Sequence, residues 1–211
     1  MNRRTLDRLD RWVQRIDKIR PIGEGGYIMR LKVFRYREPR LVLQDGTVVN
    51  PGDLVGEFHM ENRHAAALHE EGSGGFRFRQ EMFRMLPALA HDLCTRPEYR
   101  TINAVCGASL FWNSSTLGAA MGFEHRPLPP FTRWWLGWWT RYLLAHYHPE
   151  GEQRLRKGGR TELRRVWITR GALLRFAERT AARKRSGKTR MLEEHSGERT
   201  PGPSPADIPL A

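Results

Sequence analysis

The order of apolar and polar residues along the chain predicts alternating helices and strands. In residues 1–20, leucine, valine and isoleucine recur at helical spacing with arginine and aspartate between them, which predicts an amphipathic helix. Between residues 27 and 60, several short runs alternate between apolar and charged residues, a period of two that is typical of strands. Asp45-Gly46 separates two of these runs and predicts a hairpin turn.

The second half of the chain continues the alternation. Apolar residues at core spacing predict a helix over residues 76–93, and the apolar run over residues 102–111 predicts a strand covered on both faces. Gly122 follows a short apolar helix, at the position where a left-handed residue commonly ends a helix. The pattern further predicts a helix rich in tryptophan over residues 131–148, a strand over residues 165–169 and a last helix over residues 171–180.

Taken together, these elements predict an α/β (α+β) fold with a mixed, largely antiparallel sheet and helices on both faces. We expect three segments: an N-terminal amphipathic helix over residues 1–20, an α/β domain over residues 21–180 and a tail over residues 181–211. The tail is charged and then rich in Pro and Ser, so we expect it to be disordered. A chain of 211 residues can bury a core of ordinary size.

Charge and cysteine content narrow the possible partners and surroundings. Lys and Arg number 36 against 23 Asp and Glu, a formal net charge of +13, which predicts an anionic partner or surface. No secretory signal and no apolar run near the length of a membrane span is visible, so we expect a cytoplasmic protein. Cys94 and Cys106 lack metal spacing, so we predict buried thiols and no metal site.

A candidate site lies at the end of the predicted strand 54–60. Glu57 and His59 share the face of this strand opposite Phe58, and Asn62 follows at the start of a helix. Strand ends are the usual location of sites in α/β sheets, so we take His59 and Glu57 as candidate catalytic residues and Asn62 as a candidate ligand-binding residue. The alternative is an exposed strand face followed by a helix cap.

Further candidate ligand-binding residues come from other turns of the chain. Asn113 follows the strand over residues 102–111, Ser73 and Gly74 open the long helix, and His148 and Glu150 lie in the turn after the aromatic helix. A neutral imidazole and two amides suit a hydroxyl-rich or acyl ligand, because such a ligand needs both donors and acceptors.

The helix over residues 131–148 carries four tryptophans within six positions: Trp134, Trp135, Trp138 and Trp139. Two interpretations stay open, a helix of the core and a helix at a membrane interface, where tryptophan places its ring in apolar surroundings and its N–H in water. Stacking of these rings on bases or sugars is a third.

The succession of a strand, Asn113, a short helix and Gly122-Phe123 resembles the closing half of the GNAT acyltransferase fold. This resemblance implies an acyltransferase that uses acyl-CoA or a similar thioester, with His59 or Glu57 as base. In that family a Gly-rich turn before a helix holds the coenzyme pyrophosphate. Here the corresponding turn contains Glu-Glu-Gly-Ser-Gly-Gly, and its two carboxylates disfavour tight coenzyme binding.

Several motifs, taken in order, are similar to the YkoP-like family of bacterial proteins: DGTVVNPGD, GEFHMEN, TLGAAMGFE, LLAHYHPEG and RRVWITR. The resemblance covers roughly residues 20–176. It implies a bacterial, envelope-linked role and suggests a polysaccharide deacetylase as a partner, because similar domains occur attached to such enzymes. It assigns no catalytic residues, and the chain lacks the paired aspartate and His-x-x-x-His pattern of those hydrolases.

Three functions therefore follow from the sequence. The leading one is an accessory protein of envelope polysaccharide or lipid metabolism at the inner face of the membrane, with an anionic lipid surface or acidic polysaccharide as partner. An acyltransferase is the second. A nucleic-acid-binding protein is the third, which the charge permits although no recognised binding motif is present.

Overall fold

The computed structural model describes residues 15–61, 74–109, 115–147 and 163–196, together with Arg8, Trp12 and Ala67. The chain divides into two units, Met1–Ala177 and Glu178–Ala211. The strands and the candidate site belong to the first unit.

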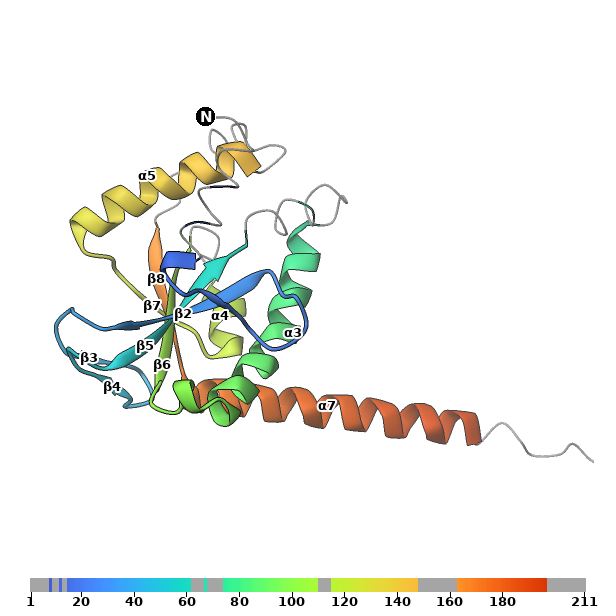
Figure 1. The fold of residues 1–211 in the computed structure, drawn as a ribbon. Coiled ribbons are helices and arrows are strands. Elements are labelled where there is room, and N and C mark those ends of the chain that lie inside the picture. Colours follow the sequence, from blue (N-terminus) through green and yellow to red (C-terminus); the bar gives the residue numbers. More distant parts are fainter. Residues whose placement is uncertain are drawn as a thin grey trace, which may run out of the picture. The chain divides into compact units, whose positions relative to one another are not determined.

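The described strands are β1 Arg20–Pro21, β2 Met29–Arg35, β3 Leu41–Val42, β4 Val48–Val49, β5 Leu54–Met60, β6 Ala104–Ser109, β7 Glu124–Arg126 and β8 Arg164–Thr169. The longer helices are α3 Gly74–Thr95, α4 Ser115–Met121, α5 Pro130–Tyr147 and α7 Arg170–Ser196, and η1 is a short 3-10 helix at Pro97–Tyr99. Within the described residues, six strands form one sheet in the order β1-β2-β5-β6-β8-β7, and β3 and β4 form a separate hairpin (Figure 1).

The sheet is mixed and mostly antiparallel, as the sequence predicted. Only β5 and β6 run parallel among the described pairs, and α3 lies between them in the chain, as a parallel connection requires. The short helix α4 separates β6 from β7, and both strands belong to the same sheet. This order agrees with the predicted β-α-β succession, while the resemblance to the GNAT fold stays a prediction.

One face of the sheet is packed against helices. The apolar residues of α3 recur at helical spacing, so Met85, Leu89 and Leu93 are all fully buried in the main core. They share this core with Val105 of β6 and Ile168 of β8. In Figure 1, α3 and α4 lie on this side of the sheet.

The opposite face is covered at one end by the β3–β4 hairpin. Leu43 and Val49 of the hairpin segment pack with Cys106 and Trp167 of the sheet in a second buried cluster. Tyr36 meets Trp167 edge to face at a ring distance of 5.9 Å. A hairpin, rather than a helix, therefore covers this part of the second face.

The hairpin turn is joined to the start of α7 through side chains. The Thr169 hydroxyl donates a 2.5 Å hydrogen bond to the Asp45 carboxylate and accepts one from the Ala172 N–H at 3.0 Å. Thr169 is thus the N-cap of α7, and Asp45 places a negative charge at a helix start, where the helix dipole favours it.

Gly122 ends α4 in the left-handed conformation that the sequence predicted, with φ of +90°. The Phe123 N–H donates to the Gly118 carbonyl and the Gly122 N–H to the Ala119 carbonyl, both at 2.9 Å. This pair of bonds is the Schellman arrangement, and it satisfies two carbonyls that a helix end leaves free. The chain then turns directly into β7.

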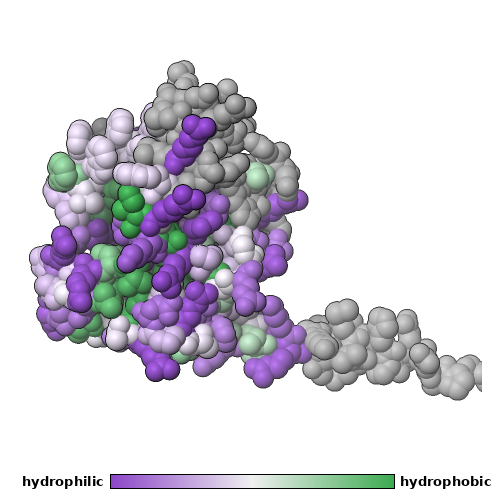
Figure 2. Space-filling model, viewed as in Figure 1, coloured by the Kyte–Doolittle hydropathy of each residue, from purple (hydrophilic) through white to green (hydrophobic). Residues whose placement is uncertain are grey.

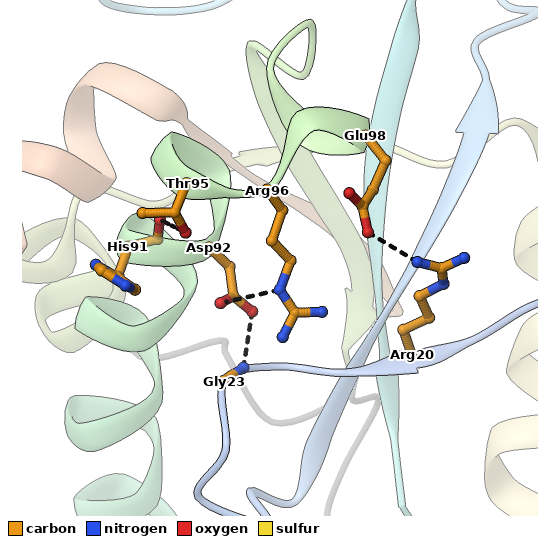
Figure 3. A network of polar contacts seen from close by, with 7 residues as sticks. All are labelled: Arg20, Gly23, His91, Asp92, Thr95, Arg96 and Glu98. Carbon is orange, nitrogen blue, oxygen red and sulfur yellow. Dashed lines mark hydrogen bonds and ion pairs between the residues drawn. The ribbon is translucent and has the colours of Figure 1, made fainter.

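The segment before β2 is fastened to the end of α3 by a buried carboxylate (Figure 3). Asp92 accepts the Gly23 N–H at 2.7 Å and forms an ion pair with Arg96 at 3.2 Å. Nearby, Arg20 pairs with Glu98 at 2.8 Å on the surface. Asp92 is 4 % exposed, so its two partners keep a buried charge from lying unpaired.

Three predictions made from the sequence need correction or extension. The predicted last helix ended at Thr180, whereas α7 continues to Ser196, and residues 197–211 lie outside the described residues. Cys106 is buried as predicted, but Cys94 is exposed because Leu93 takes the core position in the last turn of α3. The predicted N-terminal helix extended to residue 20, whereas Arg20 and Pro21 form the strand β1, which is too short to show an alternation.

Candidate functional site

Strand β5 places two of the predicted site residues side by side. Glu57 and His59 are two residues apart, so they project from the same face of the sheet, while Phe58 between them packs against the main core. Nε2 of His59 lies 3.1 Å from Oε2 of Glu57, and the two side chains are 32 % and 33 % exposed. The structure therefore brings the two candidate catalytic residues into one hydrogen-bonded pair that water reaches.

Basic residues on neighbouring strands surround this pair. In the register of the sheet, Lys32 of β2 lies opposite Glu57 and Arg30 lies opposite His59. Each of these cations has its own carboxylate: Lys32 pairs with Asp17 at 2.6 Å, and Arg30 pairs with Glu61 at 2.8 Å.

The electrostatic setting keeps Glu57 ionised. Partial burial raises the pKa of its carboxyl, but the hydrogen bond from His59 and the positive charges of His59, Lys32 and Arg165 outweigh this effect, so the pKa lies below its usual value. An ionised carboxylate oxygen can only accept a hydrogen bond, so Nε2 of His59 is the donor to Glu57. In the neutral form of the imidazole, Nδ1 is then an acceptor. This is the arrangement of a carboxylate-oriented imidazole base.

The floor of the polar face comes from β6. The last paired positions of β5 and β6 are Glu57 and Cys106, so the next residues on the same face are His59 and Ala108. Cys106 is fully buried, and burial raises the pKa of its thiol well above the usual value. Ala108, one step further along, is exposed. The covered part of this face therefore ends between Cys106 and Ala108.

Arg165 of β8 lies on the other side of Ala108, opposite it in the register. Its side chain is 16 % exposed and donates to Glu38 at 2.5 Å. A surface cavity of about 430 Å³ borders this region and is lined by Phe34, Arg35, Tyr36, Arg37 and Glu38. Among the described residues, Glu57 and His59 are the polar site residues predicted from the sequence that lie on this face.

The remaining predicted site residues are not tested by the structure. Asn62, Ser73, Asn113, His148 and Glu150 lie outside the described residues, and Gly74 is described only as the first residue of α3. The proposal that His59 and Asn62 face one pocket therefore stays a prediction.

Sequence reasoning missed Lys32, Arg165 and Ala108 as neighbours of the Glu57–His59 pair. Lys32 stood out only as one polar position of an alternating strand, and Arg165 only as the first residue of another. Their proximity depends on which strands pair and in which register, and strands distant in the chain give no local signal of that.

The described part of the chain also bears on metal binding and on membrane insertion. There, no group of three or more His, Cys, Asp or Glu side chains is placed so that it could hold a metal ion. None of the helices in that part is both long enough and apolar enough to cross a membrane.

A second unusual surface lies on α5. Four of its aromatic side chains, which we call the aromatic stripe, point into water: Phe131 (75 % exposed), Trp134 (68 %), Trp135 (49 %) and Trp138 (52 %). Their rings contact one another in pairs, Phe131 with Trp134 at 6.2 Å and Trp135 with Trp138 at 5.5 Å.

The other side of α5 is the packed side. Leu136 contacts Leu128 and Leu163, and Gly137 is buried. In Figure 2 the surface at the place of α5 is pale rather than purple, because tryptophan lies near the middle of the hydropathy scale. The helix is therefore seated on the domain by one side while the aromatic stripe faces outward.

Comparison with known proteins places the chain in a family. The model of the YkoP domain matches residues 3–177, which include the whole sheet and α5. The chain belongs to the YkoP domain family. This agrees with the resemblance drawn from the sequence motifs, and the matched region ends where the first structural unit ends, at Ala177. No curated protein and no solved structure matches the chain significantly.

Proposed function

We propose that this protein is an accessory protein of bacterial envelope polysaccharide or lipid metabolism that binds peripherally to the inner face of the membrane. The aromatic stripe of α5 carries this proposal. Exposure of large aromatic side chains to water costs free energy relative to their burial against an apolar surface. Contiguous exposed apolar patches therefore mark interaction sites. Membership of the YkoP domain family supports the envelope-linked part of the proposal.

Charge favours a lipid surface as the occupant of the stripe. Tryptophan prefers the headgroup region of a bilayer, where its ring is dry and its N–H remains hydrated. The formal net charge of +13 adds attraction to anionic lipids, which weakens as salt screens it. Outside α5, Trp12 and Ile16 are also exposed, at 61 % and 58 %.

Vesicle co-sedimentation of the full chain tests the proposal. Binding is expected to rise with the anionic lipid fraction and to fall with salt. The triple variant Trp134→Ala, Trp135→Ala, Trp138→Ala should weaken binding by roughly tenfold or more, since each ring contributes apolar area to the interface. Val42→Ser is the matched control, because Val42 is an exposed apolar residue (45 %) of the hairpin.

Two outcomes of the vesicle experiment would reject the proposal. Equal binding to neutral and anionic vesicles would show that charge does not drive the binding. Unchanged binding by the triple variant would show that the aromatic stripe is not the surface that contacts lipid. A polysaccharide deacetylase or an acidic polysaccharide would then be the next partners to test by the same variants.

Acyl transfer is a second candidate, favoured by one specific observation. The ladder between β5 and β6 ends at Glu57 and Cys106, although β5 runs on to Met60 and β6 to Ser109. The Glu61 N–H donates to Ile28 of the β1–β2 segment, so by alternation the Met60 main chain is directed toward β6. Free N–H groups at such a position suit an acyl carbonyl oxygen, and His59 would be the base.

A thermal-shift titration with acetyl-CoA separates this candidate from the first. Saturable stabilisation would indicate coenzyme binding, because binding of a ligand to the native state raises its stability. Its retention in His59→Ala would separate coenzyme binding from the role of His59 as base. Absence of any shift, together with vesicle binding, would favour the accessory role alone.

A further inference from the structure

The polar face around Glu57 and His59 has the features of a ligand site that is independent of the aromatic stripe. Within the described residues, neither Oε1 of Glu57 nor Nδ1 of His59 has a hydrogen-bond partner, although the other oxygen and nitrogen of the pair bond each other. Both side chains are about one-third exposed, so a ligand in solution can reach the pair.

Ala108 makes room between the polar groups. It lies in the interior of a six-stranded sheet, between β5 and β8, and it is nevertheless exposed. Alanine is smaller than His59 on one neighbouring strand and Arg165 on the other, so the surface at Ala108 should lie below these side chains. We call this place the depression. Strands β5 and β8 are two strand spacings apart, about 10 Å, which is enough for a six-membered ring or a short polyol.

The charges around the depression indicate what kind of ligand it takes. The cations that the strand register places around it are each paired with a carboxylate: Arg30 with Glu61, Lys32 with Asp17, Arg165 with Glu38 and Arg126 with Glu124. Each of these pairs has no net charge, and the charge left over is that of the Glu57 carboxylate beside His59. The surroundings are therefore neutral to negative, which disfavours a phosphate or carboxylate ligand despite the basic chain.

Hydroxyl groups satisfy this set of partners. A hydroxyl both donates and accepts, so it can donate to Glu57 Oε1 or to His59 Nδ1 and accept from an N–H of Arg165 that Glu38 does not use. We propose that the depression bounded by Glu57, His59, Ala108 and Arg165 binds an uncharged ligand with neighbouring hydroxyl groups. The ligand lies over Ala108, with one hydroxyl on the Glu57–His59 pair and the next on Arg165.

Two sources share this chemistry, a sugar ring and a glycerol unit. Full-length protein with ¹³C-labelled alanine methyl groups and labelled histidine is titrated with glycerol, glucose and maltotriose, and separately with inorganic phosphate. The expected result is a saturable shift of the Ala108 methyl and His59 ring signals with one of the polyols. Preference for the two sugars indicates a saccharide, and preference for glycerol a lipid or teichoic-type polyol.

Matched variants locate the site. Ala108→Leu fills the depression while leaving Glu57 and His59 themselves unchanged, and it should weaken polyol binding by roughly tenfold or more. Ala120→Leu, at an exposed alanine of α4, is its control. His59→Ala and Glu57→Gln should weaken binding likewise, whereas His91→Ala, at an exposed histidine of α3, should not. Glu57→Gln keeps size and shape, so it remains informative if another variant folds poorly.

The proposal is overturned by any of three results. The first is the absence of any polyol-induced shift at up to about 0.1 M polyol, a concentration far above a millimolar Kd. The second is an unchanged polyol affinity in Ala108→Leu. The third is a shift that phosphate causes and that no polyol causes. Vesicle binding by the same variants is measured in parallel. Because the depression and the aromatic stripe share no residue, failure here leaves the membrane proposal standing, and the reverse holds.

Discussion

Nε2 of His59 lies 3.1 Å from Oε2 of Glu57, on the face of β5 that is turned away from the main core. The pair combines two features that a site for proton transfer or ligand binding needs. It is hydrogen-bonded and oriented, and it is also open to solvent.

Replacement of Glu57 by glutamine should reduce stability at neutral pH and have little effect in acid. The native pKa of Glu57 is lowered, because the raising effect of burial is outweighed by His59 and the nearby cations. A carboxylate of this kind stabilises the native state above its unfolded pKa, and the contribution disappears as the pH falls through the folded pKa. We expect a loss of about 1 kcal/mol at pH 7.

Urea unfolding near pH 7 and near pH 3 measures the two values; the lower pH lies well below the usual carboxyl pKa of about 4.3, because the folded pKa of Glu57 is itself lowered. Glu98→Gln is the control, because Glu98 belongs to an exposed surface pair. An equal loss at both pH values would assign the effect of Glu57→Gln to packing rather than to charge.

The two cysteines should differ sharply toward a thiol reagent. Cys94 is exposed, whereas Cys106 is buried and its pKa is raised by burial. Because the thiolate is the reactive form, only Cys94 should react with a disulfide reagent in the native protein. Absorbance of the released thiolate should show one equivalent in buffer and two in denaturant. Rapid reaction of Cys94→Ser in buffer would show that the sheet opens at Cys106.

Gly122→Ala should destabilise the protein through two effects at once. The backbone φ of +90° strains any L residue, and an added Cβ would lie 3.0 Å from the Cβ of Ala172. Gly46→Ala is the matched control, because its φ is +84° while an added Cβ meets nothing within 4 Å. We expect about 1–2 kcal/mol from the strain in both and a further loss at Gly122. Equal thermal unfolding of the two variants would contradict the contact argument.

Asp92→Ala should cost more than loss of a surface ion pair. Asp92 is buried and accepts the Gly23 N–H, so its removal leaves that N–H and the Arg96 side chain without their partner. The expected loss is about 1–3 kcal/mol in chemical denaturation. Glu98→Ala removes only the exposed pair with Arg20 and should cost at most about 1 kcal/mol. Similar losses in both variants would show that the Asp92 contact adds little.

Local patterns were enough to locate most elements of the first unit. The alternation around Glu57 predicted β5 over residues 54–60, and the structure has the same bounds. Gly122 was predicted as a left-handed helix end because the turn chemistry is contained in adjacent residues. Such features depend on residues a few positions apart, so the sequence alone determines them.

The site and the exposed surfaces were decided by tertiary structure. Arg165 is more than a hundred positions from Glu57 in the chain, and only the pairing of β6 with both β5 and β8 brings them to one face. The spacing of the aromatic residues in α5 allowed either a core or an interfacial helix, and packing of Leu136 against Leu128 decided which side of the helix faces outward. Sequence period determines which residues share a face, but long-range strand register and helix docking determine what that face meets.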